Sequence, residues 1–261
     1  VLYRFDLATD TYSVVYNFND FSGFQTIGII GDPVEPVLYG YSAFDGANNL
    51  GTLYSFNYQT DAFTVLHDFG TNQYGVLPQY SLALRNGKLY VSTTQQGGNG
   101  SGATFTYDLS NGNKELLLTH NSNLGIIPPS AANWIDIDGT LYGFGHQNNG
   151  GLFTFDETTK EQSLLVDFGF QEFGENPSGG LLDLGDGLFV SGTETGGVNN
   201  DGSIFTYDRS TGNATKLFDF ERNVTGTNIT GVPVLAANGK LYGETTFEGP
   251  FNQGAFWVYD F

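Results

Sequence analysis

Short segments in which large apolar side chains alternate with small or polar ones recur along the whole chain. Residues 51–56, 102–107 and 202–207 show the alternation most clearly. A period of two places successive side chains on opposite faces of a β-strand. Good helix formers do not cluster at helical spacing in the sequence. The pattern therefore predicts an all-β chain of many short strands.

The segments are of four kinds, which we call strand positions A, B, C and D in their order within each repeat. Position B carries a Leu-Tyr or Leu-Phe pair, and position C follows it after a loop rich in Gly and Asn. Position D ends in most copies on an Asp-Phe or Asn-Phe pair, but the third copy ends on His120. The leucines of position B are Leu38, Leu89, Leu141, Leu188 and Leu241, which are 51, 52, 47 and 53 residues apart. The chain is therefore a repeat with a period of roughly fifty residues.

A short apolar string at position A precedes most of these pairs. It is joined to position B by a tight turn, which contains Asn-Gly at residues 86–87 and 238–239. Asn-Gly between apolar runs is a strong hairpin signal because both residues accept a positive φ. The strings lie at residues 82–84, 134–137, 181–184 and 234–237, and the first copy, expected near residues 33–36, is degraded.

Four antiparallel strands in each repeat of this length predict a five-bladed β-propeller. We expect one domain over residues 1–261, with complete blades near residues 19–69, 70–121, 122–169 and 170–220. A fifth blade would combine residues 1–18 with residues 233–261, so that the N- and C-terminal partial blades close the ring. The aromatic residues of positions B, C and D would form the core between blades. A parallel solenoid is the main alternative, although its coils are usually shorter.

Position C occurs six times, whereas positions A, B and D occur five times each. The chain opens on C and D and ends on A, B and C. The surplus C strand would make a five-stranded closing blade, or it would pair with another molecule or with further chain. The start at Val1 without Met suggests a processed or trimmed segment.

The string Leu-Tyr-Gly-Glu-Thr-Thr at residues 241–246, the Gly-rich loop that follows it, and the string Val-Leu-His-Asp-Phe at residues 65–69 resemble the GloVer repeat. The resemblance extends over essentially the whole chain, although Leu188-Phe189-Val190 departs from the Leu-Tyr-Gly core. It implies a propeller in a secreted or surface-anchored bacterial protein, and hence an extracellular or cell-surface location. It implies no catalytic residues.

The net charge of −19, with nine Lys and Arg, argues against nucleic acid and anionic membranes as partners. No apolar run is long enough to cross a membrane. The chain contains no cysteine, so disulfides, thiolate metal sites and Cys nucleophiles are excluded.

Geometry favours one face of the propeller as a ligand site. The D-to-A and B-to-C connections share a face, and they include the long loops 70–79 and 168–177. The B-to-C loops are rich in Gly, Asn and Asp, which could bind Ca²⁺ through their oxygens. We prefer the interpretation that these residues supply turn geometry, and we expect no cofactor and no metal site.

Candidate ligand-binding residues are few. Carboxylates that converge on a central channel would indicate a glycosidase, and the candidates are Asp136, Asp138, Asp183 and Glu244. They do not form a recognisable catalytic set. Trp134 opens an A strand and could stack on a sugar, whereas Trp257 lies in a C strand, where core packing is favoured. His67, His120 and His146 are interpreted as structural, with His67 and His120 at roughly equivalent positions in D.

The sequence contains four glycosylation sequons, at Asn99, Asn213, Asn223 and Asn228. This count is close to chance, and all four residues fall in predicted loops, where they would be usable in a host that glycosylates.

The leading hypothesis is a non-enzymatic extracellular module that acts by adhesion or assembly, through strand exchange of its terminal partial blades. Its partners would be further copies of the chain or other surface proteins. A lectin-like propeller that binds glycans is the first alternative, and a glycosidase is the second.

Overall fold

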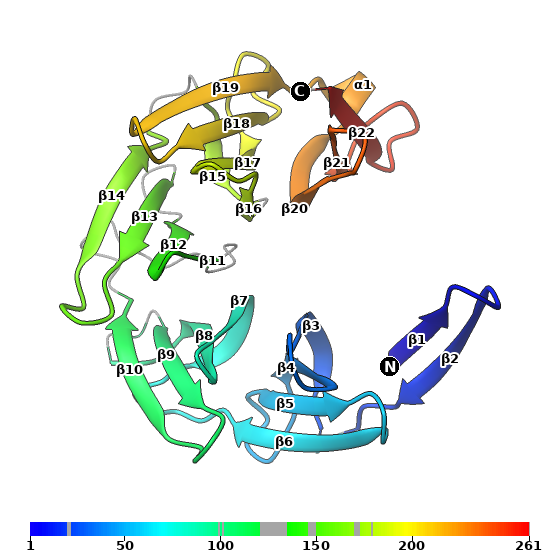
Figure 1. The fold of residues 1–261 in the computed structure, drawn as a ribbon, viewed down its shortest axis with the longest axis vertical. Helices are drawn as coiled ribbons and strands as arrows, with labels where there is room; N and C mark the ends of the chain where they lie inside the picture. Colours follow the sequence, from blue (N-terminus) through cyan, green and yellow to red (C-terminus); the bar gives the residue numbers. More distant parts are fainter. Residues whose placement is uncertain are drawn as a thin grey trace. The chain divides into compact units, whose positions relative to one another are not determined.

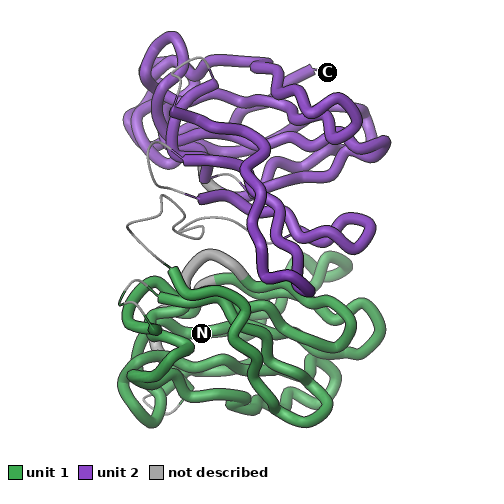
Figure 2. Tube along the Cα trace, turned by 90° about the vertical axis from the view of Figure 1, so that its left-hand side faces the viewer, with its two compact units in different colours: residues 1–121 green, residues 122–261 purple. Residues whose placement is uncertain are grey.

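The computed structural model describes the chain except for residues 20–21, 99, 101, 121–134, 146–149, 170–172, 179 and 261. The described residues form two compact units, residues 1–121 and residues 122–261 (Figure 2). Both units consist of antiparallel sheets, and the one helix in the described part is a single turn.

Unit 1 contains a two-stranded hairpin followed by two four-stranded sheets (Figure 1). In each sheet every strand pairs with its neighbours in the chain, so the sheet is a simple meander. The strands are β1 (Leu2–Asp6) and β2 (Thr11–Tyr16); β3 (Phe24–Gly31), β4 (Val37–Phe44), β5 (Thr52–Asn57) and β6 (Ala62–Asp68); and β7 (Val76–Arg85), β8 (Lys88–Gln95), β9 (Ala103–Asp108) and β10 (Lys114–Thr119).

Unit 2 contains two further complete meanders and a three-stranded sheet. In the second meander, position A is split into two short strands that both pair with β17. The elements are β11 (Ile135–Ile137), β12 (Thr140–Gly145), β13 (Gly151–Phe155) and β14 (Gln162–Asp167); β15 (Glu175–Pro177), β16 (Leu182–Asp183), β17 (Leu188–Thr195), β18 (Ser203–Asp208) and β19 (Asn213–Asp219); and α1 (Arg222–Thr225), β20 (Thr227–Leu235), β21 (Lys240–Phe247) and β22 (Ala255–Asp260).

The predicted fold, an all-β propeller of four-stranded antiparallel blades, is confirmed. Position C is occupied six times in the described chain, by β1, β5, β9, β13, β18 and β22. The hairpin β1–β2 provides C and D, and the sheet β20–β22 provides A, B and C, as the strand count predicted. The two partial blades lie in different units, so their union in one blade stays a prediction, as does the single domain.

Aromatic side chains of position C form the core between consecutive blades of a unit. Each packs against the last residue of the preceding D string, which we call the closing aromatic residue. Ring centroids are 5.4 Å apart for Phe18 and Tyr54, and 4.9 Å apart for Phe168 and Phe205. The pairs Phe69–Phe105 and Phe220–Trp257 repeat the contact at 6.2 and 5.9 Å. Trp257 is thus a core residue, as predicted.

The glycine of the Leu-Tyr-Gly string makes room for these rings. Gly40 pairs with Tyr54 across β4 and β5, and a Cβ on Gly40 would lie 2.5 Å from the Tyr54 Cζ. Gly243 faces Trp257 in the same way, and a Cβ there would overlap the indole ring. The repeat therefore uses Gly where a large ring crosses the neighbouring strand.

Three sequence-based alignments need correction. Position A starts earlier than predicted, because β7 begins at Val76 and β20 at Thr227, and the first A strand is β3 rather than residues 33–36. The loops 70–79 and 168–177 are correspondingly shorter, since β15 begins at Glu175. In the fourth repeat Ser191, not Val190, pairs with the aromatic Phe205 and so occupies the glycine position.

Candidate functional site

The B-to-C loops share one backbone conformation. In the loops 45–51, 196–202 and 248–254, the first, second, fifth and seventh residues all have positive φ, between 56° and 96°. Gly, Asn and Asp tolerate this conformation best. In the first loop the Gly51 N–H closes the turn on the Asp45 carbonyl at 2.9 Å, and in the last loop Gly254 closes on Glu248 at 2.8 Å. The composition of these loops thus follows from their geometry.

The D strand is fastened to the same loop by two side chains. Asp68 Oδ1 accepts the N–H of Ala47 at 2.7 Å, and Asn48 Nδ2 donates to the Phe69 carbonyl at 2.9 Å. In a later repeat, Asp219 and Asn199 make the same bonds to Val198 and Phe220, at 2.9 and 2.8 Å. The loop oxygens and amides therefore bind the protein's own backbone, and the described residues contain no cluster of His, Asp or Glu that could hold a metal ion.

A hydroxyl of strand B joins the D-to-A connection to the start of strand C. Thr93 Oγ1 donates to the Tyr74 carbonyl at 2.8 Å and accepts the Ala103 N–H at 3.0 Å. Thr245 does the same with Thr225 and Ala255. The residue after Tyr74 must be Gly75, because a Cβ there would overlap Thr93 Oγ1. The face predicted for a ligand is thus held together by internal bonds.

The candidate carboxylates are all exposed in the described chain. Asp136 Oδ1 accepts the Gly139 N–H at 3.1 Å, and Asp138 pairs with Arg209 at 2.7 Å. Asp183 accepts the Gly185 N–H at 2.8 Å. Glu244 lies on β21, opposite Phe256 of β22. Three of the four therefore bind other parts of the chain itself. Trp134, His146 and Asn99 lie outside the described residues.

The other sequons occupy regular elements. Asn223 lies exposed in α1, and Asn213 is the exposed first residue of β19. Asn228 lies within β20, and its Oδ1 is buried without a hydrogen-bond partner. The prediction that these residues lie in loops is therefore wrong, and the buried amide of Asn228 is poorly placed to carry a glycan.

The described histidines have different positions within D, contrary to the sequence prediction. His120 is the closing aromatic residue of its repeat, since its N–H bonds the Gly102 carbonyl as Phe69 bonds Gly51. Its Nε2 lies 3.2 Å from Thr104 Oγ1. His67 lies two residues before a closing aromatic residue, with its Nδ1 3.3 Å from Lys114 Nζ. Burial lowers the pKa of His67 to about 4, and the charge of Lys114 acts in the same direction.

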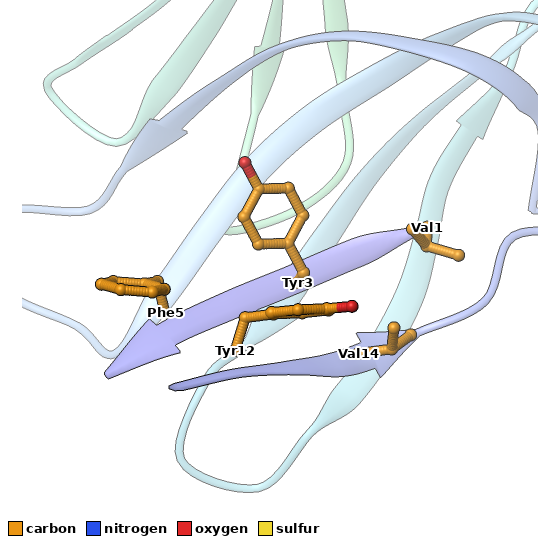
Figure 3. Close-up of a pocket in the computed structure, with 5 residues that line it drawn as sticks. All are labelled: Val1, Tyr3, Phe5, Tyr12 and Val14. Carbon is orange, nitrogen blue, oxygen red and sulfur yellow. The ribbon is translucent and has the colours of Figure 1, made fainter. Parts of the chain in front are cut away.

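One face of the N-terminal hairpin is apolar and exposed. We define the hairpin face as Val1, Tyr3, Phe5, Tyr12 and Val14, which line an open pocket on β1 and β2 (Figure 3). Tyr3 is 65% exposed, whereas Tyr54, at the same place in the next repeat, is 1% exposed. In that repeat Tyr16 and Phe18 of the preceding D string cover the corresponding rings of Phe63 and Tyr54. The described chain supplies no such cover for Tyr3.

The C-terminal sheet, β20–β22, has no strand at position D in the described chain. In the described chain β22 is an edge strand, whereas every other C strand is flanked by its D strand. One face of β22 is also exposed. Phe256 is 75% exposed, whereas Leu53, at the corresponding position of the first complete blade, is fully buried. The strand count pointed to these incomplete ends. Single residues of the sequence did not, because Tyr3 and Tyr54 have the same local pattern.

The fold defines the class of protein as a repeat β-propeller. Solved propeller-like structures match at low identity, which supports the fold alone. TolB from Acinetobacter baumannii matches with a TM-score of 0.61 and 13% identity, over 90% of this chain and 51% of that one. A chain of the nidogen/laminin complex matches with a TM-score of 0.58 and 12% identity, over 90% and 80%. The extracellular domain of a hybrid two-component system from B. thetaiotaomicron matches with a TM-score of 0.60 and 14% identity, over 96% of this chain and 28% of that one.

The chain belongs to the Gloeobacter/Verrucomicrobia repeat family, whose sequence model matches residues 1–146. This agrees with the resemblance seen in the sequence. The chain spans about half of the TolB chain that it matches. A comparison with curated protein sequences finds no significant match. In the described part of the chain no helix is long and apolar enough to cross a membrane.

Proposed function

We propose that the protein is a non-enzymatic module that binds other proteins at the cell surface or outside the cell. The observation that carries the proposal is the hairpin face, a group of five exposed apolar side chains. The rings that correspond to Tyr3 and Tyr12 in the first complete blade, Tyr54 and Phe63, are covered by rings of the preceding D string. An apolar patch of this kind, on an otherwise acidic surface, is typical of an interaction site. Nidogen and laminin form a complex of two proteins, which fits such a role for this fold.

An extracellular location is part of this proposal. It rests on the family resemblance and on the likeness to extracellular domains of B. thetaiotaomicron proteins. Glycan binding and glycoside hydrolysis are less well supported, because the described candidate carboxylates Asp136, Asp138 and Asp183 contact other parts of the chain itself.

Photo-crosslinking tests the proposal. A photoreactive phenylalanine analogue replaces Tyr3 in the whole chain, and a control chain carries it at Val34, which is exposed and lies outside the hairpin. After incubation with surface and secreted proteins of the source organism, we expect defined protein adducts from position 3 and none from position 34. Equal labelling from both positions, or saturable binding on a glycan array without protein adducts, would overturn the proposal.

A further inference from the structure

We propose that Glu194 and Ser178 form a proton-controlled latch that holds β20 against β17. Both strands belong to unit 2, where β20 is the first strand of the last sheet and packs on β17 of the preceding blade (Figure 1). The inference goes beyond the proposed function and does not involve the hairpin face. It follows from the hydrogen bonds that one serine hydroxyl makes between the two strands.

Strand β20 approaches β17 closely at Gly192. A Cβ on Gly192 would lie 2.5 Å from Ile229 Cδ1 and 2.8 Å from its Cγ2, so glycine leaves the room that the isoleucine needs. Glu194 is two residues further along β17, and its side chain therefore lies on the same face of the strand. The half-buried carboxyl group of Glu194 thus faces β20.

Ser178 connects the same two strands. It lies between β15 and β16, the two short strands into which position A is split, and its N–H donates to the Gly192 carbonyl at 3.2 Å. Its Oγ donates to the Ile229 carbonyl of β20 at 2.8 Å and is also in hydrogen-bond contact with the Glu194 carboxyl. The Ser178 hydroxyl therefore lies between an acceptor on β20 and a carboxyl group on β17.

The hydroxyl of Ser178 has a single proton, and this determines the state of the carboxyl group beside it. A carbonyl oxygen can only accept, so the serine proton is used in the bond to Ile229. The contact with Glu194 then needs a proton on the carboxyl, which donates to Ser178 Oγ. An ionised Glu194 can only accept, so it competes with the Ile229 carbonyl for the serine proton. A proton on Glu194 therefore closes the latch, and its loss opens the latch.

Burial favours the closed latch, because it raises the pKa of the Glu194 carboxyl above the ordinary value of 4.5. A hydrogen bond donated by Ser178 to the ionised carboxylate would instead lower that pKa. The latch should be fully closed below about pH 4.5 and should open as the pH rises through the raised pKa. Opening takes a hydrogen bond from β20 at Ile229, next to Asn228, whose Oδ1 is already buried without a partner.

Few other titratable groups surround the latch. Strand β20 has none, and Glu175 of β15 lies opposite Thr195, beside Glu194. Asp201, in the loop after β17, is paired with Arg222 at 3.0 Å. In the described part of the chain, no charged side chain contributes to the pKa of Glu194. The titratable groups of β16 and β18 pair with the far end of β17; they are Asp183, Tyr207 and Asp208.

Two other blades have a neutral residue at the position of Glu194. Thr94 of β8 and Thr246 of β21 stand there, one residue before the residue that pairs with the start of position A. Thr94 Oγ1 donates to the Leu77 carbonyl of its own blade at 3.2 Å. Of these three strands, β17 alone brings a carboxyl group to the contact with the next sheet.

The direction of the hydrogen bond is tested by NMR titration of the Glu194 carboxyl carbon in the whole chain, with Glu194→Gln to assign the signal. Ser178→Ala removes the acceptor of the protonated carboxyl, so the pKa of Glu194 should fall by about half a pH unit or more. Ser178→Thr keeps a hydroxyl and should leave the pKa near that of the unchanged protein.

A pKa that stays the same or rises in Ser178→Ala would overturn the inference, because a rise means that Ser178 donates to the ionised carboxylate. A pKa that falls equally in Ser178→Thr would overturn it as well, since loss of the hydroxyl would then not be the cause.

Hydrogen exchange of the β20 amides tests whether the latch holds the strand. In Glu194→Gln the side-chain amide can donate to Ser178 Oγ at every pH. The unchanged protein should protect β20 as well as this variant does at about pH 4, and about twofold to tenfold less well once Glu194 is ionised. Glu175→Gln removes the neighbouring carboxyl and is the matched control, so it should exchange like the unchanged protein. A ratio of exchange rates between the unchanged protein and Glu194→Gln that does not vary with pH would contradict the latch, as would a Glu175→Gln variant that behaves like Glu194→Gln.

Discussion

At the residue scale, the repeat is maintained by a few steric requirements rather than by a recurring polar site. Glycine stands where an aromatic ring crosses the neighbouring strand, as at Gly40 and Gly243. A hydroxyl stands where three backbone segments meet, as at Thr93 and Thr245. These residues recur because the same contacts within a blade recur, so their repetition reports packing.

Gly40→Ala should destabilise the protein by about 1–3 kcal/mol, because the new methyl group would overlap the Tyr54 ring in a tightly packed core. The matched control is Gly31→Ala in the same sheet, where the added Cβ meets only Leu38, at 3.8 Å. Chemical denaturation of both variants measures the difference. An equal loss of stability in the two variants would contradict the steric explanation.

His67 should make stability depend on pH in a defined window. Its folded-state pKa is about 4, below the ordinary value of 6.5, so the unfolded chain binds the proton first as pH falls. The free energy of unfolding should therefore decrease from about pH 6.5 to about pH 4, by about 1–2 kcal/mol after allowance for partial exposure. His67→Phe, which places a ring where the first and last D strings have Tyr16 and Phe218, should flatten this part of the profile. The measurement is denaturant unfolding across that range, and a slope unchanged in the variant would contradict the assignment.

At the element scale, the B-to-C loops 45–51 and 196–202 are each hydrogen-bonded to the D strand beside them. Asp219 accepts the Val198 N–H and lies 2.9 Å from Lys216 Nζ. Asn199 completes the connection at the Phe220 carbonyl. The loop is therefore ordered by the strand that lies beside it as well as by bonds of its own.

Asp219→Ala should release the loop 196–202 and cost about 1–2 kcal/mol, since it removes the acceptor of a backbone N–H. Asp219→Asn keeps an acceptor oxygen and should recover most of the loss. Hydrogen exchange at Val198 should quicken in the alanine variant and much less in the asparagine variant. Equal exchange rates in both would show that the carboxylate charge, not the hydrogen bond, orders the loop.

The sequence predicted strands well and their ends poorly. Alternation identified positions B and C because Leu-Tyr and the following aromatic residues mark both faces of a buried strand. Position A was predicted too short, since the chain continues into it through Gly75 and Leu77, which both have positive φ and interrupt the alternation. His120 was misaligned because it stands at the position that a closing Phe has in other repeats. The hairpin face could not be predicted from its residues, because exposure depends on which neighbouring blade is present.

At the scale of the whole molecule, charge and apolar surface act in opposite directions. The chain carries a net charge of −19, and yet it presents the hairpin face and Phe256 to solvent. Like charge keeps copies apart at low ionic strength and is screened by salt. Association through apolar contacts and strand pairing should therefore be governed by ionic strength.

Self-association should strengthen as salt rises from about 10 mM to about 150 mM, because the Debye length falls from about 30 Å to about 8 Å. Sedimentation velocity at several protein concentrations measures the effect. The variant Tyr3→Ser with Phe256→Ser should remain monomeric throughout, and Val34→Ser with Val198→Ser provides a control in which exposed apolar side chains are lost elsewhere. Association that weakens with salt would indicate ion pairs between copies instead.

Pro250, in the loop before β22, has a consequence for folding, because it stands where Ala47 and Val198 donate an N–H to an aspartate of the D strand. A chain with five similar D strands faces a sorting problem, since each C strand could capture the wrong neighbour before the blades are complete. The loop N–H and the aspartate at the end of the D strand together favour correct pairing. Ala47 and Val198 donate an N–H to a strand that ends in Asp, whereas Pro250 has no N–H to donate. Strands β6 and β19, whose strings end on Asp68 and Asp219, are thereby directed away from the edge of β22, whereas β10, whose string ends on Thr119-His120, is not. Replacing residues 250–251 by Ala-Asn would give this loop the same hydrogen-bond donors as the loops 45–51 and 196–202. The replacement should therefore increase the fraction of misassembled species on refolding.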